Sequence, residues 1–273
     1  MKTAFSTVAC MGVSWQTVLS GAVRAGMDAV EIRMDDDGRI FGLPDTELDT
    51  VAQAFCKAGV QISDIGSGIR FADYDAAVVK RARQCVDQAA QLGARGVRVF
   101  PGSFVRRFSD PTPHNVAAMA RFLREAADYA ADKGVEIWIE THNEFSTGAA
   151  MRPLLLQAGR GSVKVIWDLI HPIEQGEMPE QTLTYLGDSI AHIHVKDGRK
   201  TQDPDQIDFL YTRLGEGELP LRDTLRMLGK SGYTGYYSLK WENAWRPEIR
   251  GLYSSLDALL ADWNTFLQSV ENR

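Results

Sequence analysis

The feature that most restricts the fold is an eightfold alternation of strand-like and helix-like segments along the chain. The strand-like segments are short, apolar and rich in β-branched residues, and the longer segments between them have the apolar spacing of amphipathic helices. The strand-like segments cover residues 3–9, 29–33, 60–66, 96–100, 135–142, 163–168, 190–197 and 236–242, and the helical ones 14–26, 45–59, 73–93, 113–134, 147–158, 179–186, 219–232 and 254–270. Eight such pairs in 273 residues predict an α/β fold, a parallel (β/α)₈ barrel that forms a single domain over residues 1–273. A doubly wound open sheet is the alternative, but the first strand is not followed by the G-x-G-x-x-G turn of that fold.

The composition limits the partners. A net charge of -6 and a pI near 5.4 argue against nucleic acid and anionic membranes, which require clustered Lys and Arg. No stretch approaches the roughly 20 apolar residues of a membrane span. The predicted partner is therefore a small molecule.

The cysteines and the N-terminus bear on the compartment. Cys10, Cys56 and Cys85 form no C-x-x-C pair and leave an odd thiol, which favours a reducing compartment and predicts a cytoplasmic protein. The first residues faintly resemble a signal peptide, but their apolar run is short and interrupted by hydroxyl side chains. A first strand is the preferred interpretation.

Polar residues gather where the later strands end. In a parallel barrel the loops that follow the strands meet at one rim, and chemistry is concentrated there. The candidates at this rim are Glu140, His142, Asp168, His171, His194, Lys196, Lys240 and Glu242. The longest predicted loop, residues 198–218, leaves from the same rim, and structureless loops of this length are usually functional or disordered.

Four of these residues form a candidate metal site. Glu140, Asp168, His194 and Glu242 offer three carboxylates and one imidazole, a set that suits Mn²⁺, Mg²⁺ or Co²⁺ better than a structural zinc. Such an ion can bind the carbonyl and hydroxyl oxygens of a sugar and acidify the adjacent C–H. A neighbouring carboxylate can then move the proton through an enediolate. Mn²⁺ is the preferred ion in this interpretation.

Each candidate also has a structural interpretation. Glu140 can be an acid paired with a neighbouring Arg or Lys, and Asp168 can cap the following helix. His192, one inward step below His194, is better explained as a buried, hydrogen-bonded residue than as a ligand. His142 is either directed at a ligand or exposed to solvent, and Lys196 admits both interpretations.

Arginines could also contact an oxygen-rich substrate. Arg33 and Arg98 are predicted to point inward, where they would bind substrate oxygens, although a structural pair between Glu31 and Arg98 is an equal alternative. Arg106 and Arg107 follow the fourth strand, and a solvated face explains them better than a phosphate clamp.

Several motifs resemble a known family. The strings IETHN around Glu140, WDLIHPIEQGEMPE from Trp167, HIHVKD from His192, LGEGELP from Leu214 and GYYSLKWENAW from Gly235 are similar to the xylose-isomerase-like TIM-barrel superfamily of sugar isomerases and epimerases. This superfamily includes ketose 3-epimerases, hydroxypyruvate isomerase and inosose dehydratase, and more distantly abasic-site endonucleases. The resemblance covers nearly the whole chain.

The resemblance implies roles for particular residues. A divalent metal would be held by Glu140, Asp168 and His194, and His171 would bind substrate oxygens. The family's fourth ligand is a Glu within S-x-E-W-E, where this chain reads SLKWE and places Lys240. Residues 240 and 242 are predicted to share one side of a strand, so Glu242 could replace the ligand. Alternatively, the Lys240 ammonium supplies the charge and the metal is weak or absent.

Three functions follow from these observations. The first is a metal-dependent isomerase or epimerase of a keto-sugar, with Glu140 as the base. The second is a lyase or dehydratase of the inosose dehydratase type, because a one-base reaction suits the loss of one family glutamate. The third is a metal-free sugar-binding or partner subunit. An endonuclease is disfavoured by the small number of histidines and by the acidic charge, and a homo-oligomer is possible.

Overall fold

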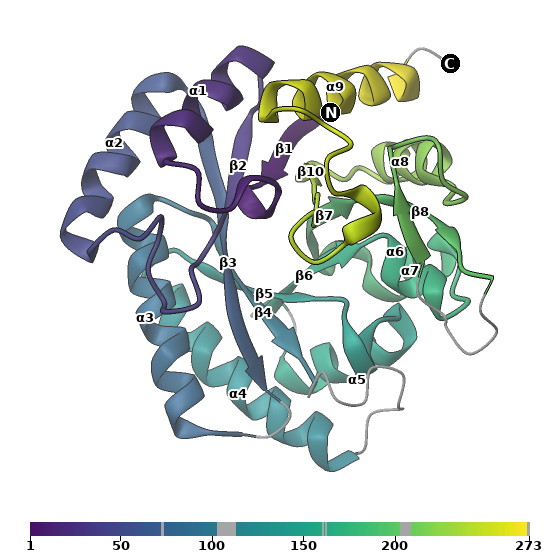
Figure 1. Cartoon of the computed structure of the whole chain (residues 1–273). Helices are drawn as coiled ribbons and strands as arrows, with labels where there is room; N and C mark the ends of the chain where they lie inside the picture. The colour runs from purple at the N-terminus through teal and green to yellow at the C-terminus, as the bar shows by residue number, and fades with distance from the viewer. Residues whose placement is uncertain (72–73, 103–112, 160, 162, 203–208, 272–273) are drawn as a thin grey trace.

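The computed structural model describes residues 1–71, 74–102, 113–159, 161, 163–202 and 209–271 (Figure 1). Eight parallel strands close into a barrel in the order β1-β10-β7-β6-β5-β4-β3-β2, which confirms the predicted (β/α)₈ barrel. These strands are β1 Lys2–Ser6, β2 Ala29–Arg33, β3 Gln61–Phe71, β4 Gly96–Pro101, β5 Glu136–Glu140, β6 Val163–Asp168, β7 Ile190–Val195 and β10 Tyr236–Leu239. In the described part of the chain, no helix is both long and apolar enough to cross a membrane.

Helices surround the barrel and follow its strands in the chain (Figure 1). They are α1 Trp15–Ala25, α2 Leu48–Ala58, α3 Ala76–Leu92, α4 Pro113–Ala131, α5 Gly148–Ala158, α6 Ile170–Glu174, α7 Pro179–Leu186, α8 Leu221–Lys230 and α9 Leu256–Glu271. The bounds of α1 follow from its caps. The Ser14 hydroxyl accepts a hydrogen bond from the Thr17 amide at 3.4 Å, and Gly26 ends the helix with a φ of 66°.

The barrel interior is unusually polar. Most buried apolar residues form one large cluster, and a separate small cluster consists of Ala4, Ala29 and Tyr236. Glu31, Asp64 and His192 are also completely buried. Burying a charged group costs folding free energy unless the group is paired, so the contacts among these side chains determine their charge states and possible ligands.

The ends of several strands differ from the sequence prediction. β5 ends at Glu140 and β10 at Leu239, so Lys240 and Glu242 follow the last barrel strand and do not lie on it. The predicted extension of this strand to Glu242 is therefore wrong, although both side chains line the same pocket. β1 ends at Ser6, where the serine hydroxyl accepts a hydrogen bond from the Val8 amide and starts a 3-10 turn.

The long loop after β7 contains regular structure. The antiparallel strands β8 Asp197–Lys200 and β9 Phe209–Thr212 form a hairpin within it. Phe209 and Tyr211 are buried while Leu210 is exposed, an alternation that identifies a strand with one packed face. The carboxylate of Asp197 accepts hydrogen bonds from the amides of Gly198, Gly215 and Gly217. These bonds hold the hairpin to the chain before α8.

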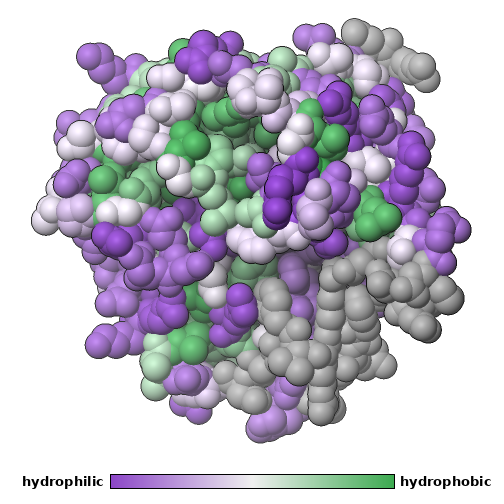
Figure 2. Space-filling view, in the orientation of Figure 1, coloured by the Kyte–Doolittle hydropathy of each residue, from purple (hydrophilic) through white to green (hydrophobic). Residues whose placement is uncertain are grey.

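The surface in Figure 2 mixes hydrophilic and hydrophobic residues, and the hydrophobic ones lie in small groups. The large exposed apolar side chains come from separate parts of the chain and include Val23, Leu156, Leu210 and Trp245. Single exposed apolar residues of this kind are ordinary on protein surfaces.

Candidate active site

Glu140, Asp168 and His194 converge at the ends of the neighbouring strands β5, β6 and β7. His194 Nδ1 lies 3.5 Å from Glu140 Oε1 and 3.7 Å from Asp168 Oδ2. All three side chains are completely buried. The predicted convergence is thus present, because β5, β6 and β7 are consecutive in the barrel and each carries its polar side chain inward.

Lys240 lies between the two carboxylates. Its Nζ atom is 2.5 Å from Glu140 Oε1 and 3.3 Å from Asp168 Oδ2, and its side chain is 3% exposed. β10 is the barrel neighbour of β7, so the residue that follows β10 reaches the same point as His194. A fixed ammonium group therefore occupies the position between the carboxylates.

Two further cations complete the charge balance. Arg98 Nη1 lies 3.2 Å from Glu140 Oε2 and 3.9 Å from Glu31 Oε1. Lys196 Nζ lies 2.8 Å from Asp168 Oδ2 and 2.9 Å from Glu242 Oε2. Both side chains are buried in ion pairs, and Arg98 also lines the pocket described below, so a role of Arg98 and Lys196 in substrate binding stays a prediction.

These cations keep the carboxylates ionised. Burial by itself raises the pKa of Glu140, but Lys240, His194 and Arg98 together hold that pKa well below its usual range. The pKa of Asp168 is also well below its usual range: burial raises it, but His171, Lys196 and Lys240 together lower it by more. Neither carboxylate needs a proton at neutral pH to be stable in the barrel.

A pocket of about 760 Å³ opens above this cluster. Its lining includes Arg33, Arg98, His142, His171, Lys240 and Glu242. Arg33 also pairs with Asp36 at 2.6 Å and packs over the Trp245 ring. Glu140 and Asp168 are absent from the described lining, so Lys240 and Arg98 separate the two carboxylates from the pocket. A pocket of this size accommodates a small polar molecule.

The two pocket histidines are neutral at pH 7. Burial lowers the pKa of His142 to about 4 and holds that of His171 well below 6.5. His171 Nδ1 donates a hydrogen bond to the Thr141 carbonyl oxygen at 2.5 Å, so its Nε2 is an acceptor in the neutral ring. The rings of His142 and His171 meet edge to face with centroids 4.6 Å apart. Together they present neutral polar groups to a ligand.

Comparison with known proteins identifies the family. The model of the xylose isomerase-like TIM barrel matches residues 19–261. The chain belongs to this family. Fructoselysine 3-epimerase of Escherichia coli O157:H7 is 26% identical over 147 residues, and inosose dehydratase of Lacticaseibacillus casei is 26% identical over 137 residues.

The sequence matches cover only part of the chain, whereas the structural match covers nearly all of it. They cover 51% of this chain and 51% of the epimerase, and 45% of this chain and 46% of the dehydratase, so the chain spans about half the length of the curated relatives it matches. A crystal structure of the IOLI protein with a bound zinc atom superposes with a TM-score of 0.82 at 18% identity, over 99% of this chain and 98% of that one. This likeness shows the shared fold.

A divalent ion at the xylose isomerase-like site would need Glu140, Asp168 and His194 as ligands. Each of the three offers a ligand atom, all within 4.8 Å of one another, and Asp168 Oδ1 lacks a hydrogen-bond partner among the described residues. Lys240 Nζ, however, is already as close to Glu140 as a hydrogen bond allows. A divalent ion at this point would meet the ammonium group, so the residues as arranged do not fit it.

Glu242 does not join these ligand atoms. It pairs with Lys196 at 2.9 Å, accepts a hydrogen bond from the Tyr211 hydroxyl at 3.2 Å and belongs to none of the groups of described residues that could hold an ion. Its distance to Lys240 Nζ is 3.8 Å. The structure thus places Glu242 in the pocket wall of the barrel, beside Lys240.

Two polar residues of the barrel were not recognised as site residues from the sequence. The sequence indicates Glu31 on β2 only as a partner of Arg98, and no sequence pattern indicates Asp64 on β3. Ala29, Glu31 and Arg33 alternate along β2 and so share one face of the strand, and this pattern could have predicted that Glu31 points into the barrel. Arg106 and Arg107 lie outside the described residues.

Proposed function

We propose that this protein is an enzyme that isomerises or epimerises a small keto-sugar by moving the proton next to its carbonyl group. Two observations support this reaction class. The named relatives of the family are sugar epimerases and a dehydratase. The described chain carries a pocket that combines an ammonium group, a carboxylate and neutral imidazoles, and these groups can polarise a carbonyl and accept the proton beside it.

The observation that carries the proposal is the position of Lys240 between Glu140 and Asp168 at the floor of the pocket. A lysine ammonium has three N–H donors, and two of them face these carboxylates. The third is available to the carbonyl oxygen of a substrate. The negative charge that develops on this oxygen during enolisation would be stabilised by a cation that is already fixed in place.

Glu242 is the proposed proton acceptor. It lines the pocket beside Lys240, whereas Glu140, the base expected from the sequence, lies beneath Lys240. Burial raises the pKa of Glu242, but Lys196 and Lys240 lower it by more, so this carboxylate is ionised at neutral pH. Arg33, His142 and His171 line the pocket together with Arg98, which supports a role for them in binding the remaining oxygens of the substrate.

A dehydratase is the second candidate. Glu140 pairs with Lys240 and does not line the pocket, so Glu242 is the carboxylate near the Lys240 ammonium group that a substrate can reach. An elimination needs one base to remove the α-proton, after which a hydroxyl group leaves the adjacent carbon with a proton from an acid. Removal of the proton is common to both reactions, and the product distinguishes them.

The proposal departs from the expectation of bound Mn²⁺, because Lys240 supplies the positive charge between Glu140 and Asp168. Lys240→Glu tests this point. The substitution replaces the ammonium by the carboxylate found in the family motif, and it should make proton exchange depend on added Mn²⁺. If a chelator abolishes wild-type exchange while circular dichroism shows that the protein stays folded, and Mn²⁺ restores the exchange, the assigned role of Lys240 is overturned.

The reaction class is tested by incubating the protein with a panel of ketoses and inososes in deuterated water. Proton NMR should show loss of a C–H signal next to a carbonyl in at least one substrate, with a new epimer or aldose for the first candidate and an unsaturated ketone for the second. A panel that shows neither exchange nor product would reject both candidates and would favour a sugar-binding protein.

A further inference from the structure

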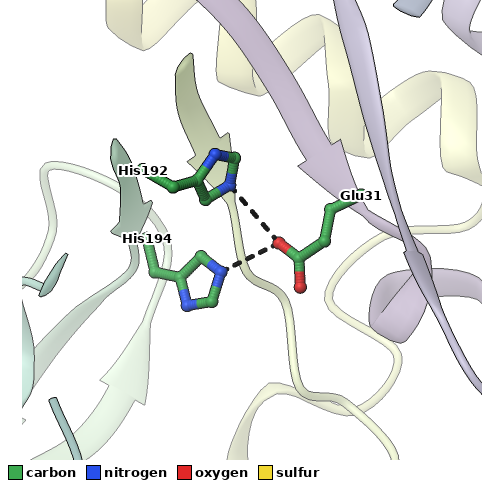
Figure 3. Close-up of side chains that lie close together, drawn as sticks. All are labelled: Glu31, His192 and His194. Atoms are coloured by element: carbon green, nitrogen blue, oxygen red, sulfur yellow. Dashed lines mark hydrogen bonds and ion pairs between the residues drawn. The ribbon is translucent and has the colours of Figure 1, made fainter. Parts of the chain in front are cut away.

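A second cluster of polar side chains lies inside the barrel, outside the pocket lining. It comprises Glu31 on β2 and the histidines His192 and His194 on β7 (Figure 3). One carboxylate oxygen, Glu31 Oε2, lies 2.8 Å from His194 Nε2 and 3.6 Å from His192 Nε2. Both imidazole rings turn a nitrogen atom toward this carboxylate. All three side chains are completely buried.

Two members of this region have polar atoms without partners. Among the described residues, neither ring nitrogen of His192 has a hydrogen-bond partner, and Asp64 Oδ2 has none. Asp64 is completely buried on β3, and its Oδ1, which accepts a hydrogen bond from the Ser63 hydroxyl at 2.7 Å, lies 3.9 Å from His192 Nε2. A buried polar atom without a partner costs free energy, so the unpartnered nitrogen of His192 that points at the Glu31 carboxylate indicates a missing ligand.

We propose that Glu31, His192 and His194, whose ligand atoms lie within 4.8 Å of one another, bind a structural divalent transition-metal ion. Ligand atoms about 2.0–2.2 Å from a tetrahedral ion are roughly 3.4 Å apart. The separations from Glu31 Oε2 to the two imidazole nitrogens, 2.8 and 3.6 Å, bracket this value. Two imidazoles and one carboxylate are a donor set that Zn²⁺ and Co²⁺ accept.

The two ring nitrogens of His194 point to different groups, so this cluster is distinct from the carboxylates near Lys240. Nε2 of its ring faces Glu31, whereas Nδ1 faces Glu140 and Asp168 at 3.5 and 3.7 Å. A metal-bound histidine usually offers its other N–H to a carboxylate, which fixes the ring orientation. The ion would replace the proton that the Glu31 and His194 pair holds in its absence.

The ion is assigned a structural role because none of its three ligands belongs to the described pocket lining. In the barrel order, β7 is separated from β2 by β1 and β10. A metal ion held by these strands would tie distant parts of the barrel wall together from inside. Folding and ion binding would then be coupled.

Elemental analysis of matched variants tests the site. The wild-type protein, dialysed against a chelator and then loaded with Co²⁺ or Zn²⁺, should retain one ion per chain after gel filtration. Glu31→Gln and His192→Asn should each lower this to less than a tenth, whereas Glu140→Gln and Asp168→Asn should retain the ion. A wild-type protein without ion, or loss of the ion in the Glu140 and Asp168 variants, would overturn the proposal.

Measurements on the wild-type chain decide the question even if the variants do not fold. X-ray absorption of the cobalt-loaded protein should show two imidazole ligands, whereas an ion held by Glu140, Asp168 and His194 would have one. The midpoint of thermal unfolding should rise by about 5–10 °C when Zn²⁺ is present at 100 times its dissociation constant. A single imidazole ligand, or an unchanged midpoint, counts against the site.

Discussion

The Nζ atom of Lys240 lies 2.5 Å from Oε1 of Glu140, two residues that are 100 positions apart in the chain. This contact places a cation of the protein itself between Glu140 and Asp168. It also separates Glu140 from the pocket and leaves Glu242 as the carboxylate beside the ammonium group. The proposed chemistry depends on this one ion pair.

Removal of the ammonium group should destabilise the fold. We expect Lys240→Met to lower the free energy of unfolding by about 3–5 kcal/mol, because Glu140 and Asp168 would lose a buried partner. Urea denaturation monitored by circular dichroism measures the change. Lys80→Met, at an exposed position of α3, serves as the control and should stay within about 0.5 kcal/mol of the wild type. A Lys240 variant as stable as this control would contradict the proposed pairing.

Glu242→Gln should abolish most of the proton exchange while the protein stays folded. A positioned general base typically contributes about 10²–10⁴-fold in rate, and the amide cannot accept the proton. The rate of deuterium incorporation into an active substrate is the measurement. Glu180→Gln on the exposed side of α7 is the matched control and should keep the wild-type rate. Unchanged exchange in the Glu242 variant would show that another group is the base.

Gly96 should not tolerate a side chain. A Cβ atom at this position on β4 would lie 2.4 Å from the ring of Trp138, which is completely surrounded in the barrel. We expect Gly96→Ala to cost about 1–3 kcal/mol, the usual penalty of overpacking a core. Gly229→Ala is the reference substitution, because Gly229 lies exposed in α8 and a Cβ atom there would meet nothing within 4 Å. It should instead stabilise the helix by about 0.5–1 kcal/mol, and thermal unfolding of both variants measures the contrast.

Thiol reactivity should separate the three cysteines. Cys56 is exposed, while burial raises the pKa of both Cys10 and Cys85 to about 12. Because only the thiolate reacts, the latter two thiols should stay slow at pH 8. An aromatic disulfide reagent should therefore label one thiol rapidly in the native protein and three in denaturant, and Cys56→Ser should remove the rapid phase. Equal rates for all three thiols in the native protein would refute the assigned burial.

Much of the fold and part of the site could be predicted from the sequence. The period of the apolar residues distinguishes strands from helices, and eight such pairs predict a barrel, which the structure confirms. The positions of Glu140, Asp168 and His194 at strand ends predicted that these three residues meet, because parallel strands bring their carboxyl ends to one rim. The hairpin of β8 and β9 was missed, since its short alternation of Phe209, Leu210 and Tyr211 lies within an otherwise loop-like stretch.

The tertiary structure decided which charges meet. The sequence shows that Lys240 replaces an expected glutamate, but only the closed barrel brings its ammonium group to Glu140 and Asp168 and sets Glu242 beside Lys196. It also brings Glu31 to His192 and His194 from a distant strand. The sequence by itself determined the eight barrel strands and the helices other than α6, because local periodicity reports burial. Ion pairs between residues 100 or more positions apart depend on strand order and register, which no local pattern contains.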